Sequence, residues 1–324
     1  MLTPEELLSR VNTAIAGLEY PSQPVGLYEP IEYVLSLGGK RIRPVFMLLS
    51  AQACGGDLSQ IMPAAVGLET YHNFTLLHDD LMDRAEMRRG KPTVHIKWDA
   101  NTAILSGDTM LVLATKYIKS AQIAGVNEAM DMFIKTALEV HDGQQYDMNF
   151  ETRLDVSEAE YLEMIRLKTS VLIACATGMG AILSGADKAT MEGLYKFGEQ
   201  IGLAFQLQDD LLDVYGDPKV FGKNIGGDIL CNKKTYLLIN ALQRANAQQR
   251  AELEHWIALT DYEPQDKIAA VTNIYNSLDI KQITINSIER YYASAKSIIE
   301  SINLPQEQIQ PLWDFAAAMM NRNY

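Results

Sequence analysis

The sequence predicts an all-α fold in which residues 1–324 form a single-domain bundle of long helices around a central apolar cavity. No segment alternates apolar and polar residues for long enough to make a sheet. Apolar segments with helical spacing stop at glycines, and they are longer than an average helix of about 11–12 residues. No Pro- and Ser-rich linker divides the middle of the chain, which favours one domain over two.

Two sequence patterns mark helix starts. Thr3-Pro4-Glu5-Glu6 combines a capping residue with proline at the first helical position, and Ser157-Glu158-Ala159-Glu160 is a capping box. Glycines end apolar segments at Gly38-Gly39, Gly55-Gly56, Gly90, Gly125, Gly216 and Gly226-Gly227. Long helices are therefore expected within residues 59–86, 98–121, 125–151, 157–186 and 189–215.

One apolar stretch has the composition of a membrane span. Val171–Leu183 reads VLIACATGMGAIL, and its thirteen residues are fewer than the ~20 needed to cross a bilayer. We therefore expect a buried core helix and no transmembrane segment. The N-terminus MLTPEELLSR lacks a signal core, and three widely spaced cysteines fit a reducing compartment. A cytoplasmic protein is expected.

The charge balance limits the partners. Lys and Arg number 28, whereas Asp and Glu number 41, so the formal net charge is −13. A chain this acidic binds nucleic acids and anionic membranes poorly, because that affinity depends on a basic surface. We expect no nucleic-acid partner. Metal ions, or anionic ligands bridged by metal, fit the composition better.

The motif D-D-x-x-D occurs twice, within Leu76–Asp83 (LLHDDLMD) and Gln206–Asp213 (QLQDDLLD). Residues four apart lie about 40° apart around a helix, so the first and last aspartates of each motif share a face. A solvated acidic helix end is the alternative interpretation. In both helices, however, a core-facing stripe leads directly into the carboxylates. The stripe residues are Leu68, His72 and Leu76 in the first helix and Ile201 and Phe205 in the second.

Carboxylates on a buried face indicate cation binding, because burying them without a partner is expensive. Hard oxygen ligands without a Cys/His pattern favour Mg²⁺, which keeps several waters and usually bridges to phosphates. Two such clusters could hold more than one metal ion.

Lys168 adds a third inward charge. It lies in the middle of an apolar stripe, and Thr169 beside it can donate a hydroxyl hydrogen bond. A surface lysine whose stem lies along apolar residues is the alternative, but acidic metal sites in the same bundle favour a phosphate contact. The stripe residues are Tyr161, Ile165, Leu172, Cys175 and Met179.

Three loops combine glycine with cations: residues 38–44 (GGKRIRP), residues 88–91 (RRGK) and residues 223–234. Glycine permits close backbone approach, and the cations form charge-assisted hydrogen bonds to phosphate. Basic loops that only maintain solubility are the alternative. The pattern G-x-x-x-x-G-K-[ST] is absent from the sequence, so these are not P-loops.

These patterns together indicate a protein that handles a diphosphate attached to a hydrocarbon. Metal ions and basic loops would stabilise the charge on a departing diphosphate, and an apolar interior would accommodate the hydrocarbon. No candidate nucleophile has an adjacent base, so covalent catalysis is not indicated. The reaction implied is the ionisation of an allylic C–O bond to a carbocation.

The quoted motifs, the Lys168-Thr169 pair and the segments HDDLMDRAEMRRGKPT and FGKNIGGDILCNKKT resemble the trans-isoprenyl diphosphate synthases, or polyprenyl synthetases, over about residues 35–240. The resemblance implies the isoprenoid synthase fold, a homodimer and a Mg²⁺-dependent prenyltransferase. Such an enzyme condenses isopentenyl diphosphate with an allylic diphosphate by ionisation, condensation and elimination, which yields a short-chain all-trans prenyl diphosphate.

The resemblance also implies roles for single residues. Mg²⁺ would be held by Asp79 and Asp83 with support from Asp80, and by Asp209 with Asp210 and Asp213 nearby. The allylic diphosphate would be held by Arg88, Lys168, Gln206, Lys223 and Lys233. Isopentenyl diphosphate would be held by Lys40, Arg43, His72 and Arg89, although a core histidine is the alternative for His72. Catalytic contacts would come from Lys168 and from the side-chain oxygens of Thr169 and Gln206 near the allylic cation. Gln144 and Asp147 would orient the metal end.

Product length would depend on side chains below Asp79, because one helical turn rises ~5.4 Å, close to one extended isoprene unit. Phe74 lies five residues before Asp79, Thr75 four and Tyr71 eight. A phenylalanine at the fifth position resembles short-chain members, so we expect geranylgeranyl or farnesyl diphosphate, with the former favoured. The alternative is that Phe74 only packs a helix interface.

Two other functions fit parts of the pattern. A class I terpene cyclase shares the metal chemistry, but it binds no second diphosphate and would not need Lys40, Arg43 and Arg89. A non-catalytic partner subunit of a prenyltransferase should have lost one aspartate motif, whereas this chain keeps both.

Overall fold

The computed structural model describes residues 1–217 and 225–320, and in that part of the chain the regular structure is helical apart from one short hairpin. The hairpin pairs β1 (Met87–Arg88) with β2 (Lys91–Pro92) antiparallel, with Arg88 opposite Lys91. The prediction of an all-α fold is confirmed.

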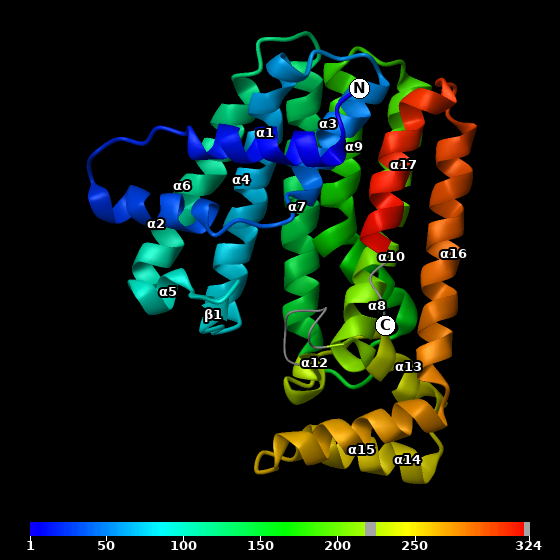
Figure 1. The fold of residues 1–324 in the computed structure, drawn as a ribbon. Helices are drawn as coiled ribbons and strands as arrows, with labels where there is room; N and C mark the ends of the chain where they lie inside the picture. Colours follow the sequence, from blue (N-terminus) through cyan, green and yellow to red (C-terminus); the bar gives the residue numbers. More distant parts are fainter. Residues whose placement is uncertain (218–224, 321–324) are drawn as a thin grey trace. The chain divides into compact units, whose positions relative to one another are not determined.

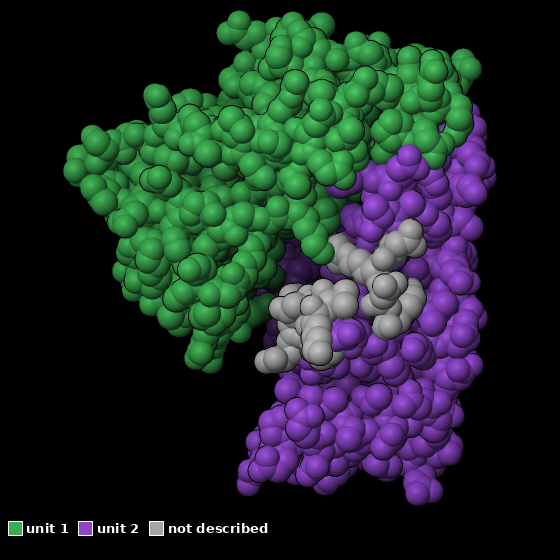
Figure 2. All heavy atoms as spheres, in the orientation of Figure 1, with its two compact units in different colours: residues 1–134, 175–195, 302–312 green, residues 135–174, 196–301, 313–324 purple. Residues whose placement is uncertain are grey.

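The chain divides into two compact units, shown in green and purple in Figure 2. The first comprises residues 1–134, 175–195 and 302–312, and the second comprises residues 135–174, 196–301 and 313–324. Each unit is therefore assembled from three separate segments of the chain. The expectation of a single domain stays a prediction.

The first unit is built around α4 (Leu58–Met82). Residues 64–71 of this helix are all buried, which is more than two turns, so no side of this stretch meets solvent. α4 packs against α3 (Ile42–Ala53) and lies beside α6 (Ala100–Lys119), as Figure 1 shows. The unit also contains α1 (Pro4–Ala16), α2 (Val25–Ser36) and α5 (Val94–Lys97).

The second unit has its own hydrophobic core. Leu207, Leu211, Leu237, Val271 and Tyr275 belong to one buried cluster, which joins α10 (Lys188–Tyr215), α13 (Tyr236–Arg244) and α15 (Pro264–Ser277). α14 (Ala247–Ala258) lies alongside α15 (Figure 1). The other short elements are α8 (Glu158–Ile165), η1 (Arg166–Ser170) and α12 (Gly227–Leu230), and α16 spans Ile280–Ser301. Four helices each contribute residues to both units: α7 (Val126–Phe150), α9 (Val171–Leu183), α10 and α17 (Gln306–Met320).

The predicted helix boundaries are close to the observed ones, with one informative exception. Thr3 caps α1 as predicted and forms a capping box with Glu6, and Ser157 forms the predicted capping box of α8. α4, however, ends at Met82 rather than at residue 86. Arg84 has φ +54°, and the Ala85 N–H donates to the Asp80 carbonyl at 2.9 Å, which closes the helix end in the manner of a left-handed cap.

The apolar stretch Val171–Leu183 forms α9, and all thirteen of its residues are buried. It is the second part of a 26-residue helical segment, Glu158–Leu183, that could cross a membrane by length and composition alone. Of the most apolar window in that segment, 83% is buried inside the protein. The prediction of a core helix is confirmed.

A buried ion pair fixes the loop before α3 onto α4. Arg41 Nη1 lies 2.9 Å from Glu69 Oε1, and each side chain is 2% exposed. The other guanidinium nitrogens donate to the Leu35 carbonyl at 2.6 Å and to Asn12 Oδ1 at 3.2 Å. Arg41 has φ +45°, so these bonds hold the start of α3 in a left-handed conformation that costs energy.

We expect Arg41→Met to lower the free energy of unfolding by about 3–5 kcal/mol, because it leaves the Glu69 carboxylate buried without its charged partner. Urea denaturation measures the change. Lys188→Met is the matched control, since it breaks an exposed pair with Glu192 (3.7 Å) in the same unit and should cost less than about 1 kcal/mol. Equal losses in the two variants would contradict this account.

Candidate functional site

The first aspartate motif lies at the C-terminal end of α4. Asp79 is half-buried, Asp80 is buried and Asp83 is exposed. Asp83 caps the helix with helical dihedrals (φ −79°, ψ −5°), and its N–H donates to the Asp79 carbonyl at 2.8 Å. Asp79 and Asp83 therefore keep the helical spacing that places them on one face, as predicted.

Asp80 forms a two-point ion pair with Arg88 of β1. Arg88 Nε lies 2.7 Å from Asp80 Oδ2, and Arg88 Nη2 lies 2.7 Å from Asp80 Oδ1. Burial raises the pKa of Asp80, while the Arg88 guanidinium opposes that rise. This paired geometry is the strong form of an arginine–carboxylate contact. Asp80 thus fixes the hairpin that carries both Arg88 and Arg89.

Arg89 connects this hairpin to the glycine-containing loop before α3. Its Nη1 donates to the Gly38 carbonyl, and Lys40 of the same loop is exposed. Gly39 has φ +140°, and a Cβ there would lie 2.9 Å from Arg89 Cζ. Only glycine combines this backbone conformation with so close an approach of the guanidinium.

Arg43 and His72 are in direct contact, with Arg43 Nη1 3.0 Å from His72 Nε2. A guanidinium has only donors, so His72 Nε2 accepts this hydrogen bond. Burial, followed by the charges of Arg43, Arg89, Arg88 and Arg41, holds the pKa of His72 well below 6.5. His72 is therefore neutral at pH 7 and orients Arg43.

The second aspartate motif lies on α10 in the second unit. Asp209 is half-buried, whereas Asp213 is 9% exposed. Asp213 Oδ2 accepts the Asp228 N–H at 2.9 Å, and the Asp213 carbonyl accepts the Gly226 N–H at 2.6 Å. Asp213 therefore orders the turn at residues 226–228, which precedes Lys233.

Asp210 lies inside the second unit and heads a hydrogen-bonded chain. It is 2% exposed, and it accepts hydrogen bonds from the Tyr161 hydroxyl and from Gln206 Nε2, the latter at 3.1 Å. Thr169 Oγ1 donates to Gln206 Oε1 at 3.0 Å. Burial, and then the charge of Asp228, raises the pKa of Asp210 to about 7, against the Tyr161 hydrogen bond and the Lys233 charge.

Lys168 and Thr169 lie on η1, a π-helical turn within the segment that was expected to form one continuous α-helix. π-turns are frequent at functional sites. Lys168 Nζ lies 2.6 Å from Asp147 Oδ2, with side chains 22% and 19% exposed. Asp147 is therefore the partner of Lys168 here.

Two glycines from neighbouring helices accommodate this π-turn. A Cβ at Gly143 of α7 would lie 2.4 Å from the Lys168 backbone nitrogen, and one at Gly202 of α10 would lie 2.6 Å from Ser170 Cα. Neither residue was predicted from the sequence. Glycines inside predicted helices were the available signal, because such glycines indicate close backbone approach.

The remaining predicted residues have the following surroundings. Lys233 is exposed, Gln144 is half-buried, and Lys223 lies outside the described residues. Tyr71 and Phe74 are buried in α4 with ring centroids 5.5 Å apart, and the Thr75 hydroxyl donates to the His72 carbonyl at 2.8 Å.

Among the residues that the structure describes, no three His, Cys, Asp or Glu side chains converge on one point as a ready-made metal site. The donor set nevertheless fits a hard cation. Asp79, Asp83 and Asp209 present carboxylate oxygens at partly or fully exposed positions, and Mg²⁺ is typically held by one or two carboxylates together with water and substrate phosphates.

The pKa of His72 predicts a pH dependence of stability. Because the pKa is lower in the folded state, the free energy of unfolding should fall as the pH drops below about 6.5, by up to about 1.4 kcal/mol per pH unit. His72→Gln should remove this contribution. Urea denaturation between pH 7 and pH 5 measures it, and His255→Gln, which changes an exposed histidine, is the control. Parallel curves for wild type and His72→Gln would contradict the assignment.

Known proteins are similar to this chain in sequence and in fold. Residues 24–275 match the model of the polyprenyl synthetase family. Geranylgeranyl diphosphate synthase from Methanosarcina mazei is 44% identical over 238 residues, which cover 73% of this chain and 74% of that protein. A crystal structure of a geranylgeranyl pyrophosphate synthase has a TM-score of 0.95 at 43% identity, covering 100% of both chains. That of the Corynebacterium glutamicum geranylgeranyl pyrophosphate synthase, in complex with isoprenyl diphosphate and magnesium, has a TM-score of 0.86 at 26% identity, covering 99% of this chain and 98% of that one.

The span matched by the family model contains both aspartate motifs and all three basic loops that contain glycine. Residues 24–275 also make up most of the 324-residue chain. This chain therefore belongs to the polyprenyl synthetase family.

Proposed function

We propose that this protein is a Mg²⁺-dependent trans-prenyltransferase that condenses isopentenyl diphosphate with an allylic diphosphate to make geranylgeranyl diphosphate. The observation that carries the proposal is the contact between Arg43 and His72 (3.0 Å). Arg43 follows the loop at residues 38–41, and Arg89 donates a hydrogen bond to the Gly38 carbonyl in that loop. It supports a basic site for a second diphosphate in addition to the aspartate motifs. A terpene cyclase has no second diphosphate and would not need it.

In this proposal, Asp79 and Asp83 hold Mg²⁺ at the first motif and Asp209 holds it at the second. Bound Mg²⁺ supplies positive charge that stabilises the departing diphosphate. The relative solved with magnesium and isoprenyl diphosphate supports the choice of metal. Asp80 and Asp213 contribute by fixing the hairpin and the turn beside these ligands.

The other roles belong to side chains of this chain. Arg88, Lys168 and Lys233 bind the allylic diphosphate, and Lys223 joins them. Lys40, Arg43, His72 and Arg89 bind isopentenyl diphosphate, with neutral His72 orienting Arg43. The Thr169 and Gln206 oxygens stabilise the allylic cation, because the bond between them and the bond from Gln206 to Asp210 fix their directions. The released diphosphate accepts the proton lost after condensation.

We further propose a homodimer in the cytoplasm. α6 exposes Ile104 (47%), Leu105 (59%) and Val112 (68%). Large apolar side chains grouped along one helix are typical of a protein interface, which supports a second copy of the chain as the partner.

The direct test is incubation with Mg²⁺, isopentenyl diphosphate and each allylic primer in turn. Geranylgeranyl diphosphate should form, and it should not form when isopentenyl diphosphate or Mg²⁺ is omitted. Conversion of the primer alone into hydrocarbon would instead identify a cyclase.

Asp79→Asn should reduce kcat by about 10³-fold, which corresponds to several kcal/mol of lost metal stabilisation. Asp261→Asn changes an exposed carboxylate between α14 and α15 and serves as the control.

Product length should depend on Phe74. Its ring is 5% exposed and packs edge-on against His78, with centroids 4.8 Å apart. Phe74→Ala should remove this barrier and lengthen the main product by at least one isoprene unit, measured by chromatography of the dephosphorylated products. Phe46→Leu, which trims a buried ring on α3, should leave the length unchanged. Products of wild-type length from Phe74→Ala would show that Phe74 only packs the helix.

A further inference from the structure

One lysine that has no role in the proposed mechanism is buried in the second unit. Lys267, in the first turn of α15, is 1% exposed and forms no ion pair with any residue that the structure describes. Its Nζ donates to Asn232 Oδ1 at 2.7 Å and lies 4.4 Å from the centroid of the Tyr262 ring. Burial of a lysine without a carboxylate is costly. The hydrogen bond to Asn232 offsets part of that cost.

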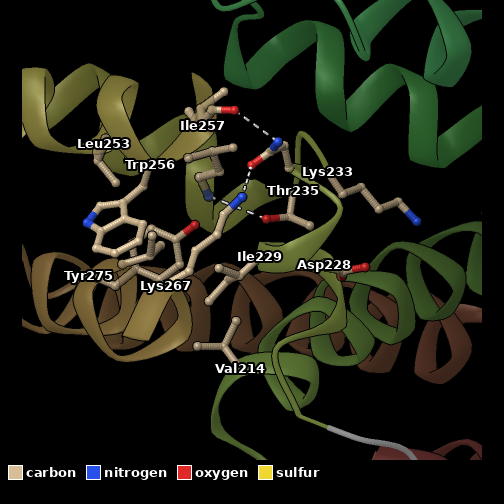
Figure 3. Close-up of a pocket in the computed structure, with 13 residues that line it drawn as sticks. Val214, Asp228, Ile229, Lys233, Thr235, Leu253, Trp256, Ile257, Lys267 and Tyr275 are labelled. Carbon is tan, nitrogen blue, oxygen red and sulfur yellow. Dashed lines mark hydrogen bonds between the residues drawn. The ribbon is translucent and has the colours of Figure 1, made fainter. Parts of the chain in front are cut away.

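Asn232 connects the turn between α12 and α13 to two other helices. Its Nδ2 donates to the Ile257 carbonyl at 3.1 Å in the last turn of α14, while its Oδ1 accepts from Lys267 of α15. Figure 3 shows both bonds. Asn232 has φ +55°, which sharply turns the chain immediately before Lys233. Its side chain therefore fixes a left-handed turn that the backbone alone would not favour.

Lys233 leaves this turn on the side away from Lys267. Figure 3 shows its side chain extending on the side of Asp228, whereas Lys267 approaches the turn from the other side. The Lys233 N–H donates to the Asp228 carbonyl at 2.9 Å, which closes the end of α12. The Lys233 charge acts on Asp210 of the second aspartate motif. The direction of the Lys233 side chain therefore depends on the backbone conformation at Asn232.

We propose that Lys267 is a positioning residue that acts through Asn232 to fix the direction of Lys233 and thereby sets the affinity for the allylic diphosphate. The inference rests on the proposed function, which assigns diphosphate binding to Lys233. It extends the functional part of the chain to the pair formed by α14 and α15, which contributes no residue to the site assigned above.

Steady-state kinetics with saturating isopentenyl diphosphate and Mg²⁺ test the proposal. Lys267→Met should raise KM for the allylic substrate about tenfold, the usual size of an effect from a residue behind a ligand-binding group. KM for isopentenyl diphosphate should stay unchanged, because its proposed residues lie in the first unit. Asn232→Gly should reproduce the effect, since glycine accepts the positive φ but makes neither side-chain bond.

A double-mutant cycle separates positioning from a general structural role. In a Lys233→Ala background, Lys267→Met should change KM for the allylic substrate less than about twofold, because the group that it positions is already absent. Val271→Ala is the matched control, since Val271 is buried one turn further along α15 and its apolar side chain forms no hydrogen bond with Asn232. It should leave both KM values unchanged.

Each outcome is decisive. A wild-type protein that forms no product overturns the proposed function, and the inference with it. If the wild type is active, the inference alone is overturned by either of two results. In the first, Lys267→Met leaves KM for the allylic substrate unchanged, and in the second it raises that KM by the same factor with and without Lys233→Ala. If circular dichroism shows that Lys267→Met does not fold, Asn232→Gly and its combination with Lys233→Ala give the same test.

Discussion

A buried carboxylate needs a partner inside the protein, and this constraint shapes both aspartate motifs. In each motif, the second aspartate is bonded within its own unit, Asp80 to Arg88 and Asp210 to Tyr161 and Gln206. Without those partners, the burial of either group would cost several kcal/mol. The first aspartate of each motif, Asp79 or Asp209, is only half-buried. In each D-D-x-x-D motif, the first aspartate is thus the carboxylate proposed to hold a cation, and the second is a carboxylate that fixes the residues around it.

The same requirement fixes the polar groups around the second motif. Gln206 has one amide oxygen and one amide nitrogen, and Asp210 can accept only from the nitrogen. The oxygen is therefore directed to Thr169, which lies on the π-turn with Lys168. The hydrogen bonds that start at the buried Asp210 carboxylate therefore set the direction of the Gln206 oxygen, which is proposed to face the allylic cation.

The basic residues of the first unit follow a related rule. Arg41 is neutralised by buried Glu69 and serves the fold, while Arg43 is paired with a neutral histidine. A neutral partner orients a guanidinium without cancelling its charge, so the charge remains available to an anion. Burial, and then the positive charges of four arginines, lower the pKa of His72 and keep it neutral.

The amino-acid sequence by itself determined the properties that depend on local spacing. The helical type of the long segments, most of their boundaries, the capping box at Ser157 and the shared face of Asp79 and Asp83 could be predicted, because they follow from periodicity and from residues within one or two turns. The motifs also carried the resemblance to the polyprenyl synthetases. The end of α4 and the π-turn at Arg166–Ser170 differed, because a left-handed Arg84 has no strong sequence signal and the π-turn depends on residues of other helices.

Only the tertiary structure decided which charged groups are partners. Asp147 and Lys168 are 21 residues apart, and Asn232 and Lys267 are 35 apart. The π-turn at Lys168 depends on glycines in two other helices. Lys267 lies four residues before Val271 on the buried face of α15, but this spacing does not identify Asn232 as its partner. Packing between distant segments selects each hydrogen-bond partner from many of the same chemical type, so this choice has no counterpart in the local sequence.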